Sequence, residues 1–267
     1  MKRLLTLVTL AVLALGLAAC ETNDEGTLVV GLECNYAPFN WTVADATTES
    51  VEIDGVNAYC DGYDVVVAQE IADGLGLDLV VRKIEWDGLI PALLSGEIDV
   101  IIAGMSPTPE RALTVSFTNE YYRSEQVLVV NDDSVYASAT SLNDFSGANI
   151  IAQLNTLQDG LIDQITSVNH QTALTDYPAL VASVTSGISD ALVAELPVAQ
   201  SIVSSNEGLT IVILGDNGFT VDDSDVSVSV AVRQEDTELL NDINAILANI
   251  TSEQRNLWME ESLIRQP

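Results

Sequence analysis

The chain has 267 residues, of which 40 are acidic and 9 are basic, giving a formal net charge of −31 at pH 7. So few basic residues leave no basic patch for nucleic acid, and they disfavour electrostatic binding to anionic lipid. We interpret the acidity as a solvated surface suited to salty surroundings, because an acidic pocket for a cationic ligand would use only a few of these carboxylates.

The N-terminus predicts an export signal. A positively charged start is followed by an apolar run from Leu4 to Leu15 and by small residues just before Cys20. This run is shorter than the roughly 20 residues that a membrane-spanning helix needs, and no later segment is long and apolar enough either. Because the pattern resembles a bacterial lipobox, we expect residues 1–19 to be removed, Cys20 to carry lipid, and residues 20–26 to form a tether. An ordinary signal peptide and a transmembrane anchor are the alternatives.

The first half of the remaining chain alternates strands and helices. Strands are expected at 27–32, 77–84 and 98–103, and helices at 62–76 and 87–94. This order is typical of a parallel sheet covered by helices.

A second α/β set follows an extended crossing segment at 125–131. We expect a helical turn at 142–147, strands at 149–152 and 190–194, and helices at 157–165, 177–186 and 197–204. A strand at 226–232 leads back, and helices at 235–250 and 252–264 close the chain. Two crossings imply a two-stranded hinge, and a mature chain of roughly 250 residues suits two lobes. We predict lobe 1 at 27–126 plus 228–267 and lobe 2 at 127–227.

The loop after the third strand carries groups suited to a ligand. The β-branched run 100–103 is typical of a strand buried on both faces. Ser106 follows at its carboxyl end, where open α/β sheets place binding crevices. We expect Thr108 to cap a short helix that Pro109 begins. Arg111 then lies beside the crevice and can clamp a carboxylate with two parallel hydrogen bonds; a surface salt bridge is the alternative.

Three cysteines and one histidine limit which disulfides and metal sites the chain can form. If Cys20 carries lipid, Cys34 and Cys60 form an even pair in an exported chain, so we predict a disulfide; two free buried thiols are the alternative. No Cys-x-x-Cys spacing exists and His170 is distant in sequence, so we expect neither a metal site nor a cofactor, and a surface position for His170. The run 222–225 lacks the glycine and glutamate of a calcium loop, and we interpret it as a solvated turn.

Four blocks of sequence carry a family resemblance. They are Gly-Leu-Glu-Cys-Asn-Tyr-Ala-Pro-Phe at 31–39, Gly-Tyr-Asp-Val at 62–65, the segment 86–122, and 153–158 paired with 194–199. Their order and spacing closely resemble the bacterial extracellular solute-binding proteins, family 3, which capture polar amino acids for ABC importers. The resemblance implies a periplasmic-binding-protein-like (type II) fold without catalytic residues. It also implies an ABC permease as partner, a monomer, and anchoring to the outer face of the cell membrane through lipid on Cys20.

The resemblance assigns groups for the ligand's α-carboxylate. Arg111 would hold it, helped by backbone N–H groups near Ser106 and near Thr156 and Leu157. The latter two begin a helix, a favourable place for an anion. Many relatives have a glycine in place of Asn155 and a threonine in place of Leu157.

The α-ammonium would meet the carbonyl of Gly104, the hydroxyl of Ser106 and the carboxylate of Glu195. Relatives usually carry aspartate at this last position, so Glu195 reaches one methylene further. The alternatives are that Ser106 caps a helix and that Glu195 is a helix-initiating acid.

The ligand's side chain would meet an aromatic wall of Tyr36 and Trp86, with Phe39 as a further candidate and plain core packing as the alternative for all three. Glu33 lies where a relative often places an acid that reaches the ligand side chain; a solvated edge position is its alternative. An acid with aromatic faces favours arginine or lysine as ligand, while glutamine, histidine and cystine stay open.

Two other functions on the same fold compete with this one. A dehydratase-like enzyme would need a general acid or base in the cleft, and Glu33 and Glu195 are the only candidates. A ligand sensor would be fused to a signalling segment. The long insertion between Asn40 and Cys60 is expected at the mouth of the cleft.

Overall fold

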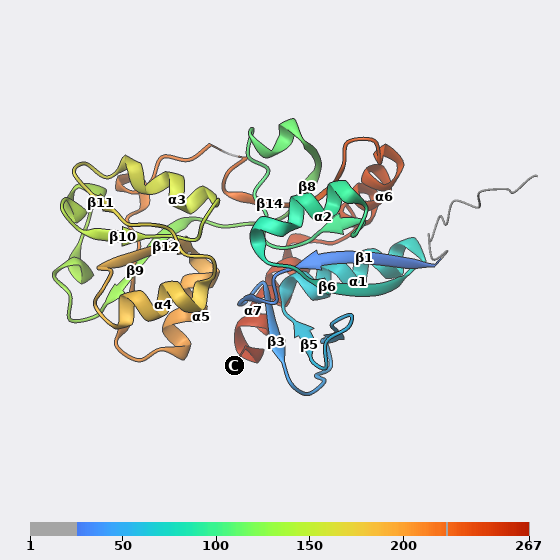
Figure 1. Ribbon diagram of the computed structural model, residues 1–267, viewed down its shortest axis with the longest axis horizontal. Coiled ribbons are helices and arrows are strands. Elements are labelled where there is room, and N and C mark those ends of the chain that lie inside the picture. The colour runs from blue at the N-terminus through green and yellow to red at the C-terminus, as the bar shows by residue number, and fades with distance from the viewer. Residues whose placement is uncertain (1–25, 223, 267) are drawn as a thin grey trace, which may run out of the picture.

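Two five-stranded sheets form the centres of two lobes (Figure 1). The structure, a computed structural model, describes residues 26–222 and 224–266. The predicted signal segment, Cys20 and all but the last residue of the predicted tether lie outside these residues. The predicted two-lobed α/β fold is confirmed.

The sheet of lobe 1 has the strand order β6-β1-β7-β14-β8. Its strands are β1 (Thr27–Leu32), β6 (Asp78–Lys83), β7 (Val100–Ile101), β8 (Val115–Arg123) and β14 (Ser227–Arg233). β1 pairs in parallel with β6 and β7, whereas β14 runs antiparallel to β7 and β8. The helices of this lobe are α1 (Tyr63–Leu75), α2 (Leu89–Ser95), α6 (Thr237–Leu247) and α7 (Ser252–Arg265), and its single turns are η1 (Trp86–Gly88) and η2 (Arg111–Leu113).

The sheet of lobe 2 repeats this plan with the order β11-β10-β12-β9-β13. Its strands are β9 (Gln126–Asn131), β10 (Asn149–Ile151), β11 (Asn169–His170), β12 (Ala191–Glu195) and β13 (Leu209–Val212). The helices are α3 (Leu157–Leu161), α4 (Tyr177–Thr185) and α5 (Leu196–Ser205), and the turns are η3 (Val135–Ser138), η4 (Leu142–Phe145), η5 (Ile162–Gln164) and η6 (Gly215–Asn217). Every residue of β12 is buried, as expected for a central strand covered on both faces.

The chain passes twice between the sheets. Ser124 and Glu125 alone separate β8 from β9, and the segment from η6 to β14 leads back (Figure 1). Beyond α7, Gln266 Nε2 donates to Ser204 Oγ at 2.8 Å, so the C-terminal segment touches lobe 2 as well. The predicted lobe limits, 126 and 227, stay a prediction.

Residues 35–61 form a small antiparallel sheet that includes the insertion. Its order is β2-β3-β5-β4, with β2 (Asn35–Tyr36), β3 (Asn40–Val43), β4 (Val51–Glu52) and β5 (Tyr59–Asp61). A disulfide joins Cys34 to Cys60 with 5.7 Å between their Cα atoms, as predicted, and both cysteines are fully buried. The bridge ties the insertion to the end of β1.

Several elements differ from the predicted ones. β8 was not expected, because register shifts against β14 break the alternation of buried and exposed residues that would reveal a strand. The expected helix 157–165 is split into α3 and η5, and the turn at η2 begins at Arg111 rather than at Pro109. The predicted cap by Thr108 is wrong, because Glu110 is the N-cap residue of η2 and makes no side-chain cap; Thr108 Oγ1 makes only a long contact of 3.4 Å with the N–H of Arg111.

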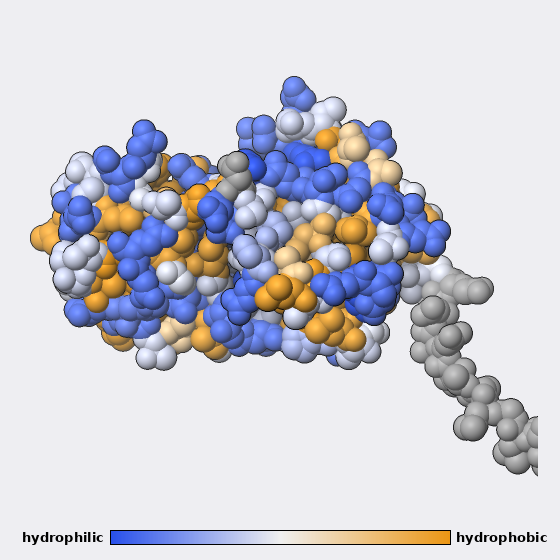
Figure 2. Space-filling view, turned by 90° about the horizontal axis from the view of Figure 1, so that it is seen from above, coloured by the Kyte–Doolittle hydropathy of each residue, from blue (hydrophilic) through white to orange (hydrophobic). Residues whose placement is uncertain are grey.

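One face of the molecule carries its polar residues diffusely (Figure 2). Figure 2 shows hydrophilic residues spread over both lobes rather than gathered on one of them. Within the residues that the structure describes, no helix combines the length and the apolar character required to cross a membrane.

The disulfide generates a stability prediction. Replacing both Cys34 and Cys60 by serine should lower the free energy of unfolding by about 3 kcal/mol, because the unfolded chain regains the entropy of the open loop. Urea unfolding of the oxidised wild type and of the double variant measures this difference. Reductant should bring the wild type to the level of the variant and leave the variant unchanged; equal stabilities without reductant would contradict the prediction.

Candidate ligand-binding pocket between the lobes

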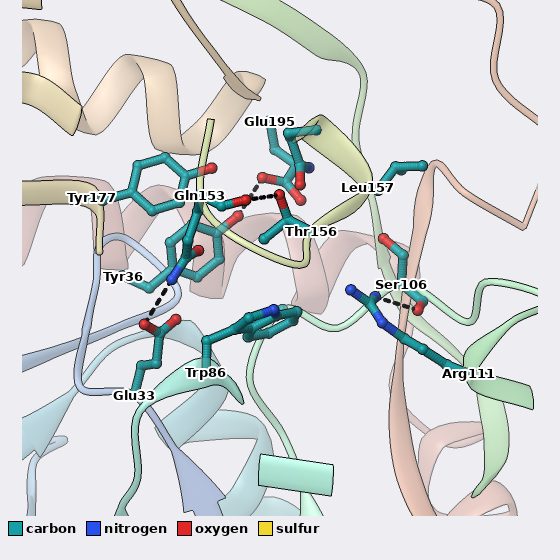
Figure 3. A pocket seen from close by; sticks show the side chains of 12 residues that line it. Glu33, Tyr36, Trp86, Ser106, Arg111, Gln153, Thr156, Leu157, Tyr177 and Glu195 are labelled. Carbon is teal, nitrogen blue, oxygen red and sulfur yellow. Dashed lines mark hydrogen bonds between the residues drawn. The ribbon is translucent and has the colours of Figure 1, made fainter. Parts of the chain in front are cut away.

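A narrow pocket lies between the two lobes (Figure 3). All nine residues predicted to contact a ligand line it: Glu33, Tyr36, Trp86, Gly104, Ser106, Arg111, Thr156, Leu157 and Glu195. Three further lining residues were not predicted: Gln153, Gln158 and Tyr177.

Glu33 is a buried acid at the end of β1, with only 2% of its surface exposed. Its Oε1 accepts a hydrogen bond of 2.8 Å from Nε2 of Gln153 in lobe 2. Burial raises the pKa of Glu33 to about 8; the bond from Gln153 lowers it, while nearby Glu85, Asp176 and Asp87 raise it. No salt bridge reaches this carboxyl group within 26–222 and 224–266. Glu33 is therefore a buried acid without a cation, not the solvated edge residue of the alternative.

Glu195 is the second buried acid, at the end of β12 in lobe 2. The hydroxyl of Tyr36 in lobe 1 donates a short hydrogen bond to its Oε2. Burial raises the pKa of Glu195, and hydrogen bonds from Tyr36 and Gln158 together with the charge of Arg111 oppose that rise. Glu195 occupies the N-cap position of α5, as the alternative expected, but its side chain makes no cap hydrogen bond and lines the pocket instead. Tyr177 packs on Tyr36, with 4.8 Å between ring centroids.

Arg111 supplies the positive charge of the pocket. Its Nη1 donates to the carbonyl of Ser106 at 2.9 Å, and its guanidinium carbon lies 5.0 Å from the ring centroid of Trp86. Burial lowers the pKa of this guanidinium, whereas Glu195 raises it. In Figure 3, Arg111 and Glu33 lie on opposite sides of Trp86, so the pocket has a positive end and an acidic end.

Asn155 joins the lobes at the edge of the pocket. Its carbonyl accepts from Trp86 Nε1 at 3.2 Å and from Arg111 Nη2 at 3.3 Å, and its Nδ2 donates to Oδ1 of Asp87 at 2.9 Å. Its φ of 58° lies in the left-handed region, where glycine is at ease and other residues are strained. Asparagine tolerates this conformation best among the rest, and here it adds a bond that glycine lacks.

The backbone around the pocket has the expected special geometry. Gly104 has a φ of 62°, and a Cβ there would lie 2.8 Å from Cε1 of Tyr36, so only glycine fits. Ser106 Oγ donates to the carbonyl of Asp225 at 3.3 Å and caps no helix. Thr156 is the N-cap of α3, since its Oγ1 accepts from the N–H of Asp159 at 3.3 Å.

Several candidates lie away from the pocket. Phe39 is fully buried behind Tyr36, stacked at 5.3 Å between ring centroids, and belongs to the core. The insertion does not cover the pocket, because none of 40–60 lines it. His170 is exposed as predicted and bonds Asp163 and Asp159 at 2.8 and 2.9 Å.

The three residues that were missed carry weak sequence signals. Gln153 and Gln158 flank Thr156, and neutral amides are equally common on any protein surface. Tyr177 comes at the start of α4, where Asp176 caps the helix and Pro178 follows, so its local pattern is that of a helix start. Only the packing of α4 against the mouth of lobe 1 brings it to the pocket.

Comparison with known proteins places the chain in a family. Residues 28–257 match the model of the bacterial extracellular solute-binding proteins, family 3, so the chain belongs to this family and the resemblance is confirmed. A probable histidine-binding protein of Campylobacter jejuni is 33% identical over 222 residues, which is 78% of this chain and 80% of that protein. An arginine-binding extracellular protein of Bacillus subtilis is 27% identical over 261 residues, 92% of either chain.

A solved structure agrees with these relatives. An amino acid ABC transporter substrate-binding protein from Streptococcus pneumoniae, bound to L-arginine, has a TM-score of 0.77 at 27% identity and covers 90% of this chain and 95% of its own. The chain is accordingly a substrate-binding protein of the amino acid ABC transporter class and not an enzyme. Membership of an extracellular family implies that it is exported.

The contact between Asn155 and Asp87 can be tested by substitution. Asn155→Gly keeps a comfortable backbone and removes only this bond between the lobes, so the unliganded protein should open more readily. We expect amino-acid affinity to fall by about two- to fivefold, the worth of one exposed hydrogen bond. Calorimetry measures the affinity, and a fluorescence pair with one dye on each lobe measures the opening.

Asp87→Ala is the matched variant for this bond. It should lose at least as much affinity as Asn155→Gly, because it also removes a negative charge near Glu33, and the double variant should lose no more than Asp87→Ala alone. Additive losses would mean that the two side chains act separately.

Proposed function

We propose that the protein binds a cationic amino acid, arginine or lysine, between its lobes and presents the closed form to an ABC permease. The observation that carries the proposal is Glu33, a buried carboxyl group at the acidic end of the pocket with a neutral amide as its partner. A buried acid is costly without a compensating charge, and a cationic ligand supplies that charge.

The rest of the pocket suits the α-amino and α-carboxylate groups that all such ligands share. Arg111 has five N–H donors and uses two in the contacts to Ser106 and Asn155, which leaves donors for a carboxylate. Glu195 would receive the α-ammonium together with the carbonyl of Gly104. These groups pair with the common part of the ligand, so they do not choose between side chains.

Selection between side chains would fall to the other end of the pocket. A guanidinium or ammonium near Glu33 would also lie close to the ring faces of Trp86 and Tyr36, and such cation–π contacts contribute about 0.5 to 2 kcal/mol. A ligand with an acidic side chain would bring a second carboxylate toward Glu33 and should be excluded. Histidine and glutamine are the second candidates, because the amide of Gln153 beside Glu33 also suits a neutral polar group.

The proposal extends to the N-terminal segment. We infer that Cys20 carries lipid and anchors a monomer to the outer face of the cell membrane, which would keep the pocket close to the permease. The lipobox-like pattern before Cys20 supports this, although the segment lies outside the described residues.

Arg111 tests the carboxylate end. Arg111→Lys should weaken binding of every α-amino acid ligand by about tenfold and Arg111→Ala by about a hundredfold or more, because a lysine cannot form the bidentate pair and an alanine leaves the carboxylate uncompensated. Arg82→Ala is the control, since Arg82 pairs with Asp54 away from the pocket and its loss should leave affinity unchanged. Near-normal affinity in Arg111→Ala would remove this residue from the site.

Glu33 tests the choice of side chain, with arginine and its neutral isostere citrulline as paired ligands. The wild type should prefer arginine, and Glu33→Gln should abolish most of that preference. Since burial raises the pKa of Glu33 to about 8, the empty pocket holds it largely protonated near neutral pH. A cation favours the carboxylate, so binding releases a proton, and arginine affinity should rise by up to about tenfold per pH unit until about pH 8 and then level off.

Calorimetry from pH 5 to 9 decides this prediction. Citrulline binding by the wild type and arginine binding by Glu33→Gln should lack the steep dependence that Glu33 causes. Tight glutamate binding, or equal affinity for arginine in the wild type and Glu33→Gln, would contradict the cationic ligand while leaving the transporter class intact.

A further inference from the structure

A buried carboxyl group lies beneath the ligand pocket and is not among the residues that line it. Asp64 is fully buried in the first turn of α1, and no salt bridge reaches it among the residues that the structure describes. Its Oδ1 accepts a hydrogen bond of 2.7 Å from the hydroxyl of Tyr121, and its Oδ2 accepts one of 2.8 Å from Nδ2 of Asn40. The site described above uses none of these three residues, and all three are buried in lobe 1.

Each partner of Asp64 also accepts a hydrogen bond from a backbone N–H group. Tyr121 accepts at its hydroxyl from the N–H of Gly104 at 3.1 Å, and Asn40 accepts at its Oδ1 from the N–H of Cys34 at 2.7 Å. Gly104 and Cys34 both have left-handed backbone, with φ of 62° and 53°. A cysteine is strained in that conformation, so its backbone needs bonds that hold it there.

These two backbone positions adjoin the residues that face the pocket. Cys34 follows Glu33 and comes two residues before Tyr36, while Gly104 lines the pocket itself and lies against the ring of Tyr36. One carboxylate thus connects the two segments of lobe 1 that supply the acidic end and the floor of the pocket.

We propose that Asp64 is a positioning residue for ligand binding, which holds the backbone at Cys34 through Asn40 and the backbone at Gly104 through Tyr121. This inference rests on the proposed function, because it assigns the purpose of the network to the ligand's contacts with Glu33 and Gly104. The hydrogen bonds of the network all run in one direction. In each of its two branches a backbone N–H donates to one side chain, and that side chain donates to the carboxylate of Asp64.

That direction makes the network testable by exchange of two residues. In Asp64→Asn, the new amide nitrogen would face either the amide nitrogen of Asn40 or the hydroxyl of Tyr121, which would then lose the acceptor for its own proton. Turning Asn40 over would only move the first conflict to the N–H of Cys34. In Asn40→Asp, two carboxylates would face each other. In the double variant Asn40→Asp/Asp64→Asn, the new amide in α1 donates to the new carboxylate in β3. That carboxylate still accepts from the N–H of Cys34, and the oxygen of the new amide still accepts from Tyr121.

The exchange keeps the composition and the net charge of the protein. It therefore distinguishes the effect of the hydrogen-bond arrangement from the effect of losing a charge. The probe is whichever of L-arginine, L-lysine, L-histidine and L-glutamine binds the wild type most tightly by calorimetry. Each single variant should bind it at least about tenfold more weakly, and the double variant should recover to within about threefold of the wild type. Urea unfolding confirms that each variant is folded at the temperature of the measurement.

Tyr121→Phe provides a second readout that a purely structural role would not move. It keeps the ring but removes the hydroxyl that accepts from the N–H of Gly104. Affinity should therefore fall for the amino acid more than for its analogue without the α-amino group, because Gly104 is placed to meet that group.

The outcomes separate the two proposals. A wild type that binds no amino acid would overturn the proposed function and the positioning role with it. A wild type that binds, with unchanged affinity in Asp64→Asn and Tyr121→Phe, would overturn the positioning role alone. A double variant that binds as poorly as the single variants would also overturn the positioning role. If Asp64→Asn does not fold, the double variant serves as the test.

Discussion

Two carboxyl groups are buried at the boundary between the lobes, and each is hydrogen-bonded to a residue of the other lobe. Glu33 belongs to lobe 1 and bonds Gln153 of lobe 2, while Glu195 belongs to lobe 2 and bonds Tyr36 of lobe 1. Closing the lobes around an empty pocket takes both acids out of water, and neutral partners compensate only part of that cost. A ligand with positive charges would compensate the rest, so the same contacts that hold it would also stabilise the closed form.

The two lobes contribute to this site in different ways. Lobe 1 supplies a platform whose shape is held by covalent and buried polar links: the Cys34–Cys60 disulfide, and the bonds that join Asp64 to Asn40 and Tyr121. Lobe 2 supplies the starts of α3, α4 and α5, which meet that platform across the pocket. Both sets lie at the carboxyl ends of strands, where parallel sheets leave room for a ligand.

For the pocket, the positions of a few acidic residues matter more than the total number of acidic residues in the chain. Most of the acidic residues that the structure describes are exposed at the surface, where solvent screens them. Glu85, Asp87 and Asp176 are different, because they lie near enough to Glu33 to raise its pKa beyond the effect of burial. These few charges make one end of the pocket acidic, whereas the total charge says little about the ligand.

Local pattern was sufficient for much of the fold. The apolar periodicity of α1, the buried run of β12 and the glycine after β7 are signals carried by neighbouring residues, and the predicted elements match them closely. Strands whose sequence pattern depends on the strands they pair with were harder to predict. β8 was missed because bulges against β14 break its alternation, and the strands of the insertion are too short to show a period.

The candidate site also has features that the sequence predicted and features that only the structure showed. Residue types and a family resemblance were enough to nominate all nine predicted lining residues, since a carboxylate clamp, an aromatic wall and a glycine at a close approach each need a particular side chain at a particular place in a motif. Sequence could not show that Glu33 is buried without a cation, that Asn155 reaches Asp87 across the lobes, or that Tyr177 joins the pocket. Burial and contacts between residues distant in the chain arise only when the two lobes meet, so the electrostatics of the pocket were decided by the tertiary structure alone.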